Sequence, residues 1–86
     1  MSQTRYAFII KAPGYSHSSH AAHMESPEFD SQFIGVSDVD EALVAAKTLV
    51  DAGTQVIELC GGFTPQEATK LRRQFPGIYI GRVTYP

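Results

Sequence analysis

The sequence predicts an α/β fold: one small domain with a four-stranded, mainly parallel sheet and two to three helices. Apolar, β-rich segments alternate with segments whose apolar residues recur every three or four positions, as on one face of a helix. The connections between them are short, and strand–helix–strand units at such spacing form right-handed parallel crossovers. A chain of 86 residues supports one modest core, so we expect a single domain over 1–86.

The first half of the chain contains two expected strands. The segment 5–11 is rich in β-forming residues and ends at an Ala-Pro-Gly turn. Because both of its faces are apolar, we place this strand in the centre of the sheet. The segment 16–25 fits a short helix that stops at Pro27. The segment 31–36 fits a short second strand, which we place at an edge.

The second half contains the two clearest helices. An amphipathic stripe begins after Asp38 and ends near Gly53, a residue that commonly ends helices in the left-handed conformation. The run 64–67, Thr-Pro-Gln-Glu, supplies an N-cap, a proline at the first helical position and a capping box. This second helix ends at the Pro-Gly pair 76–77, and a final strand is expected over 78–85.

The stretch 55–67 organises the chain and contains the predicted site. A short strand, apolar on both faces apart from one glutamate, runs into two glycines and then into the capped helix. Ligands of open α/β sheets lie beyond the carboxyl ends of the strands, and the N–H groups at a helix start favour anions. We therefore expect ligand contacts from Glu58, Cys60, Gly61, Gly62 and Thr64.

Each of these residues also has a structural interpretation. Two glycines before a capped helix suit any tight turn between a strand and a helix. A lone Cys60 fits a small core residue as well as a reactive thiol. A carboxylate in a buried strand is costly unless it is paired or hydrogen-bonded. Glu58 is thus either a functional group or the partner of Arg82 in a buried ion pair.

Two classes of function are open at this point. The first is a small ligand-binding or oligomer-forming module without catalysis. The second is an isomerase- or lyase-type enzyme acting on a carboxylate- or phosphate-bearing metabolite. In the enzyme, Glu58 is the general acid or base, His20 is its partner, and Lys11 or Arg82 holds the substrate. No serine-triad, phosphate-loop, dinucleotide or paired-cysteine motif is present, so the sequence does not decide between the two.

Three histidines at three-residue spacing raise the question of a metal site. His17, His20 and His23, together with Glu25, have the side chains to bind zinc or nickel. Their serine-rich surroundings fit a solvated polar loop instead. Metal sites usually draw ligands from separate elements with supporting hydrogen bonds, so we predict no metal and no other cofactor.

Composition limits the partners. The formal net charge is −2, and the only basic cluster is that of Lys70, Arg72 and Arg73, which argues against nucleic-acid binding. One cysteine excludes an internal disulfide and fits a cytoplasmic setting. The N-terminal apolar run is too short for a signal peptide or a membrane span. A small sheet leaves edges and a face uncovered, so we predict a homodimer or higher homo-oligomer, with a small anionic metabolite as ligand.

Two family resemblances complete these expectations. The motifs APGY, ELCGGF and RVTY, spread over nearly the whole chain, resemble a small family of uncharacterised microbial proteins known only as a domain of unknown function. That resemblance implies no activity, cofactor or substrate. The segment 38–82 is similar to the opening βαβ units of the barrel aldolases that cleave keto-deoxy-phosphogluconate, which implies a proton-transfer role for Glu58. The later strand that carries the Schiff-base lysine of those aldolases has no counterpart here.

Overall fold

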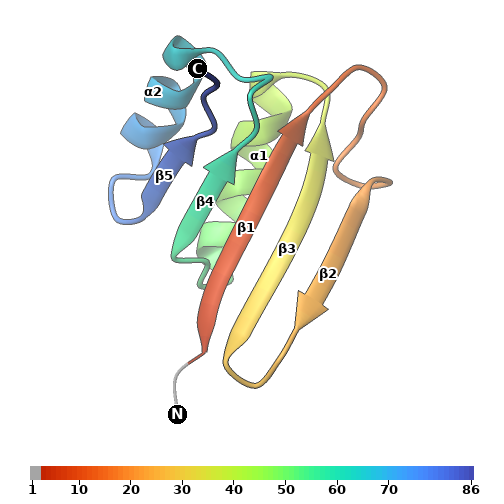
Figure 1. Ribbon diagram of the computed structural model, residues 1–86, viewed down its shortest axis with the longest axis vertical. Helices are drawn as coiled ribbons and strands as arrows, with labels where there is room; N and C mark the ends of the chain where they lie inside the picture. The colour runs from red at the N-terminus through yellow and green to blue at the C-terminus, as the bar shows by residue number, and fades with distance from the viewer. Residues whose placement is uncertain (1–2) are drawn as a thin grey trace.

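A computed structural model describes residues 3–86 as a mixed five-stranded sheet with two helices (Figure 1). The α/β class is therefore confirmed, but the sheet has five strands where four were expected. The strands, in the order β2-β3-β1-β4-β5, all pair in parallel except for β2 with β3. The elements are β1 (Thr4–Lys11), β2 (Ala21–Glu25), β3 (Phe29–Val36), α1 (Val39–Asp51), β4 (Val56–Leu59), α2 (Pro65–Gln74) and β5 (Tyr79–Arg82).

β1 lies in the centre of the sheet, as its apolar pattern predicted. It pairs in parallel with β3 on one side and with β4 on the other. Both helices cover the same face of the sheet, with α1 behind it in Figure 1. Side chains at alternate strand positions, including Ile9, Ile57 and Leu59, are fully buried against the helices. Burying one such side chain contributes roughly 1.5–3 kcal/mol, so this face supplies most of the core.

The helix ends follow the signals in the sequence. The Asp38 carboxylate accepts a hydrogen bond from the Glu41 N–H at 2.8 Å and caps α1. The Thr64 hydroxyl accepts from the Glu67 N–H at 3.1 Å, and the Glu67 carboxylate accepts from the Thr64 N–H at 2.9 Å. This is the predicted capping box. Gly53 follows α1 with φ +101°, the left-handed conformation that favours glycine.

The helix predicted over 16–25 is wrong, because 21–25 forms the strand β2. Its alanine, methionine and glutamate favour helices in isolation, but antiparallel pairing with β3 overrides that preference. Ser26 closes the hairpin: its N–H donates to the Phe29 carbonyl at 2.8 Å, and its hydroxyl accepts from the Phe29 N–H at 3.1 Å. Consequently β3 begins at Phe29 and lies between β2 and β1, not at an edge.

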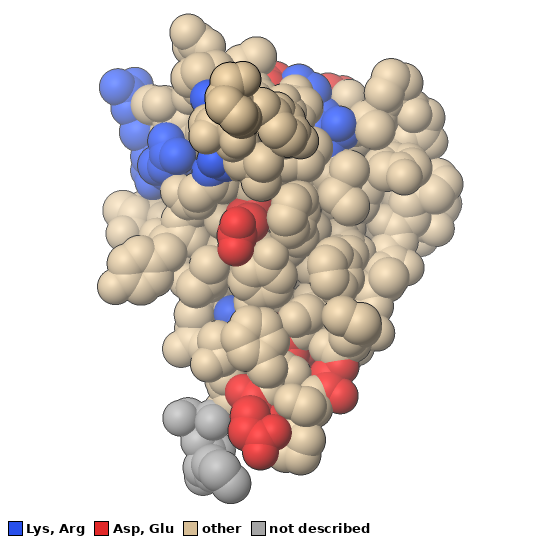
Figure 2. All heavy atoms as spheres, viewed as in Figure 1, with Lys and Arg blue, Asp and Glu red and all other residues tan. Residues whose placement is uncertain are grey.

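The other face of the sheet carries no helix within residues 3–86, and it is the face turned to the viewer in Figures 1 and 2. Strand alternation places Tyr6 and Phe8 of β1 on this face, because Ala7 and Ile9 are buried on the other. Figure 2 shows that uncharged atoms cover most of it and that charged groups gather mainly towards its ends. We call it the uncovered face.

Candidate functional site

The predicted corner is held together by a bridge between β1 and α2. The Lys11 ammonium lies 2.8 and 2.9 Å from the two carboxylate oxygens of Glu67, and 5.7 Å from the centre of the Phe63 ring. Burial raises the pKa of Glu67, but hydrogen bonds from Lys11 and from the Thr64 N–H outweigh it, so the pKa lies below its usual value. Lys11 is therefore engaged by the protein itself.

The other corner residues make close contacts within the turn. The Cys60 sulfur accepts hydrogen bonds from the N–H groups of Lys11 at 3.2 Å and Gly62 at 3.3 Å. A Cβ on Gly62 would lie 2.7 Å from the Lys11 carbonyl oxygen, and one on Gly61 would strike the Tyr85 ring. Close packing of β4 against β1 thus explains Gly62 and the thiol, and the Tyr85 ring explains Gly61. A ligand role for these residues stays a prediction.

The expected ion pair between Glu58 and Arg82 is not formed, because the two side chains lie on opposite faces of the sheet. Arg82 is paired in register with Leu59, on the helix side, and its guanidinium donates to the Phe63 carbonyl at 3.3 Å. Glu58 lies between two buried residues of β4 and so points to the uncovered face. Lys11, Arg82 and Glu58 therefore do not converge on one substrate position.

The three histidines also lie apart. His20 stacks on Tyr15, with ring centres 5.1 Å apart, and β1 and β3 separate it from β4. His17 pairs with Glu41 at 2.8 Å, and His23 pairs with Asp30. Across residues 3–86, no three His, Cys, Asp or Glu side chains gather in a way that would hold a metal ion.

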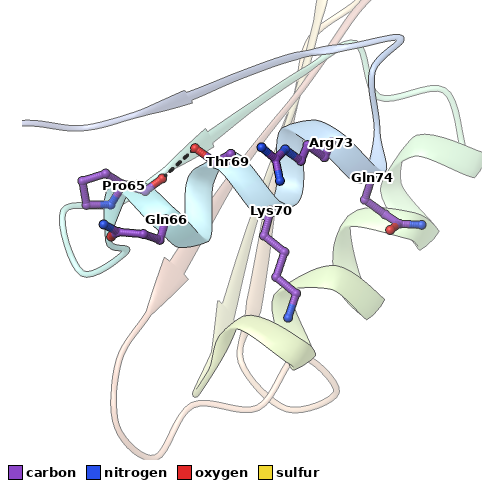
Figure 3. Close-up of a pocket in the computed structure, with 6 residues that line it drawn as sticks. All are labelled: Pro65, Gln66, Thr69, Lys70, Arg73 and Gln74. Carbon is purple, nitrogen blue, oxygen red and sulfur yellow. Dashed lines mark hydrogen bonds between the residues drawn. The ribbon is translucent and has the colours of Figure 1, made fainter.

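A surface hollow on α2 offers no closed site. Figure 3 shows that its six lining residues all come from this one helix, so no second element encloses a ligand. The Lys70 ammonium extends towards α1, where it lies 3.7 Å from the Asp40 carboxylate. The Thr69 hydroxyl donates back to the Pro65 carbonyl at 3.1 Å. The residues are Pro65, Gln66, Thr69, Lys70, Arg73 and Gln74.

Comparison with known proteins places the chain in a family. The sequence model of a family of unknown function, DUF6506, matches residues 4–86. The chain belongs to this family. The DUF6506 match spans every strand and helix of the fold, and it confirms the expected membership of a family of unknown function. No curated protein and no solved structure matches the chain, and the partial resemblance to aldolases gains no support. None of the helices in residues 3–86 is long and apolar enough to cross a membrane.

The residues that the sequence alone does not single out lie around Glu58 on the uncovered face. Phe8 of β1 and Gly81 of β5 are its register partners on either side. Burial raises the pKa of the Tyr6 hydroxyl, and the Glu58 carboxylate raises it further. The alternation of side chains within RYAFIIK and QVIELC decides which residues point to this face. Only the strand order, which makes the two segments neighbours, brings those residues together.

Large apolar side chains are exposed mainly on this same face. Six of them are exposed within residues 3–86, and four lie on the uncovered face: Tyr15, Met24, Phe29 and Tyr79. The fifth, Tyr85, covers Gly61 just beyond the end of β4. The sixth, Val44, lies on α1. Exposed apolar side chains that gather on one face are typical of interaction sites.

Proposed function

We propose that the DUF6506 chain is a homodimer-forming module that packs the uncovered face of its sheet against the same face of a second copy. The exposed aromatic surface on one side of the sheet carries this proposal. Two stacked sheets lie about 10 Å apart with interdigitated side chains, an arrangement in which aromatic and β-branched residues pack well. A cytoplasmic location, which the free Cys60 fits, belongs to the same proposal.

The charge distribution supports a self-complementary pairing. Lys11 and Arg82 end their strands at one end of the sheet, whereas Glu25 and Glu28 lie at the β2–β3 hairpin at the other end. Lys11, Arg82 and Glu25 lie on the helix side of the sheet, so these charges orient the approach of the two copies and make no contact within the interface. Figure 2 shows the same polarity, with most basic side chains above and a group of acidic ones below. A two-fold axis across the strands brings opposite charges together, and an axis along the strands brings like charges together. The former is the arrangement we propose.

The size of the face fits a stable dimer. Five strands about 4.8 Å apart span about 24 Å, and a six-residue strand is about 20 Å long, which gives a flat area of about 480 Å². Standing side chains enlarge the accessible area above this value. Stable interfaces bury about 800 Å² on each partner, so the face is of the required order.

The catalytic alternative has no comparable support. Among the residues that the structure describes, none that is basic lies beside Glu58, and His20 lies across two strands. The position of Glu58 in the middle of the proposed interface fits a ligand-binding dimer better than an isolated acid–base catalyst. The small anionic metabolite stays a prediction. The Lys11 ammonium, which was expected to hold it, is already bound to Glu67.

Light scattering coupled to size-exclusion chromatography tests the dimer. We expect the wild type to elute with the mass of two copies, and Tyr79→Glu to shift towards one copy because it places a charge in the interface. Val44→Glu is the matched control, since Val44 is exposed on α1, away from the sheet. A wild type that stays monomeric at every concentration, or equal behaviour of the two variants, contradicts the proposal.

A further inference from the structure

Gly81 is a strand glycine for which the fold provides no structural reason. It lies inside β5 and does not adopt the left-handed conformation. A Cβ built on it would meet no atom within 4 Å, whereas one on Gly35 or Gly62 would collide with Tyr15 or with Lys11. Glycine weakens a strand, and inside strands it often marks a bulge, a bend or a place where a ligand or another backbone comes close. Gly81 therefore keeps a space open at the cost of some stability.

The open space at Gly81 adjoins the Glu58 carboxylate. The two residues are register partners on the uncovered face, and Phe8 is the partner of Glu58 on its other side. Tyr6 lies close enough for the carboxylate to raise the pKa of its hydroxyl. Tyr79, two residues before Gly81 on the same face, adds a further ring. The space thus has one negative charge and aromatic neighbours.

Within residues 3–86, no basic side chain neutralises Glu58. All seven lysines and arginines lie elsewhere: Lys47 is on α1, and Lys70, Arg72 and Arg73 are on α2. On the strands, the guanidinium of Arg5 donates to the Ala52 carbonyl at 2.7 Å. Lys11 and Arg82 are engaged on the helix side, as described above. A carboxylate covered by a second sheet without a countercharge is costly.

We infer that Glu58, Gly81 and the surrounding rings of Tyr6, Phe8 and Tyr79 form a binding site for a small organic ammonium ion. Cations are attracted both by a carboxylate and by the faces of aromatic rings, most strongly when water is excluded. The inference rests on the proposed dimer, because the second copy supplies the cover that excludes water. An anionic ligand would meet the Glu58 charge directly and is disfavoured at this position.

Occupancy of this site is linked to dimerisation. In the two-fold arrangement, β4 of one copy faces β4 of the other, so both Glu58 carboxylates enter the same interface. A cation that binds only the dimer shifts the equilibrium towards it by mass action. Removing the Glu58 charge should also favour the dimer. We expect Glu58→Gln to dimerise at least as tightly as the wild type and to lose its response to the cation.

Titration with choline tests the site, with 3,3-dimethylbutan-1-ol as the uncharged analogue of the same shape. Binding to the full chain is followed by NMR through the aromatic signals, and the dimer fraction by sedimentation velocity. We expect choline, and not the alcohol, to shift the aromatic signals of the face and to raise the dimer fraction. Glu58→Gln should weaken choline binding about tenfold or more.

Two further variants separate the site from general charge and fold effects. Gly81→Val fills the space and keeps Glu58, so it should abolish choline binding while the chain stays folded. Asp51→Asn removes an exposed carboxylate from α1, on the other side of the sheet, and should bind choline like the wild type. Choline binding that falls as much in Asp51→Asn as in Glu58→Gln, or that survives in Gly81→Val, overturns the site.

The outcomes distinguish the two proposals. A wild type that dimerises through the uncovered face but shows no response to choline refutes the ammonium site and leaves the dimer standing. A chain that remains monomeric refutes the dimer, and with it the covered site as stated. Equal binding of choline and the alcohol shows apolar adsorption and also refutes the site.

Discussion

The two faces of the sheet are built from the same strands but are completed in different ways. On the helix side, Ile9, Ile57 and Leu59 are fully buried by α1 and α2. On the other side, Tyr79 is 79% exposed and Met24 is 63% exposed. Both faces carry large apolar side chains, yet the described chain covers only one. This difference is the basis of our proposal that the uncovered face packs against a second copy.

The largest contrast between the faces is expected in the stability of the isolated chain. Leu59→Ala should lower the free energy of unfolding by roughly 2–5 kcal/mol, because it opens a cavity in the core. Tyr79→Ala, measured at concentrations where the chain is monomeric, should change it by less than about 0.5 kcal/mol, as for other surface substitutions. Urea denaturation of both variants measures this difference. Comparable losses in the two would show that the uncovered face is part of the folding core.

Replacing two glycines by alanine is expected to change the stability by smaller amounts and in opposite directions. Gly62→Ala should destabilise the fold, because its Cβ would lie 2.7 Å from the Lys11 carbonyl oxygen in the tight corner. Gly81→Ala should stabilise it by roughly 0.5–1 kcal/mol, because the site has space and an ordinary backbone conformation. Thermal denaturation of the two variants side by side measures both effects. A loss of stability in Gly81→Ala would show that Gly81 has a structural role after all.

The smallest effect concerns pH and the start of α1, on the helix side. Hydrogen bonds from the N–H groups of Ser37 and His17 lower the pKa of Glu41 from 4.5 to about 2. A carboxylate with a lowered pKa adds stability above its unfolded pKa, and this contribution is lost as the pH falls from about 4.5 towards 2. Glu41→Gln should therefore flatten the acid side of the stability curve.

Glu28→Gln is the control for this acid titration, because Glu28 is exposed in the hairpin. Denaturation midpoints measured between pH 2 and pH 5 compare the two variants with the wild type. We expect the Glu28→Gln curve to follow that of the wild type throughout this range. An unchanged acid limb in Glu41→Gln would contradict the role assigned to the hydrogen bonds at the start of α1.

The sequence predicts those parts of the fold that depend on neighbouring residues. The capping box at Thr64 and Glu67 and the left-handed Gly53 are local signals, and the structure contains both. The central position of β1 followed from its two apolar faces. The strand β2 could not be predicted in this way, because its pairing with β3 is a tertiary interaction that overrides helix-forming residues.

The site was predictable only in part, for a related reason. Glu58 was identified as unusual from its position in an apolar strand, but its neighbours depend on strand order and on which face each residue points to. Arg82 pairs in register with Leu59, one position after Glu58. Because successive strand residues point to opposite faces, Arg82 lies on the helix side, away from Glu58. Phe8 and Gly81 meet Glu58 for the same reason.

Methyl NMR with a soluble paramagnetic relaxation agent tests most directly whether a second copy covers the uncovered face. The Met24 methyl reports on that face, and the Val44 methyls report on α1. We predict that Met24 becomes protected from the agent as the protein concentration rises, while Val44 stays accessible throughout. Equal accessibility of both residues at every concentration would contradict the central claim.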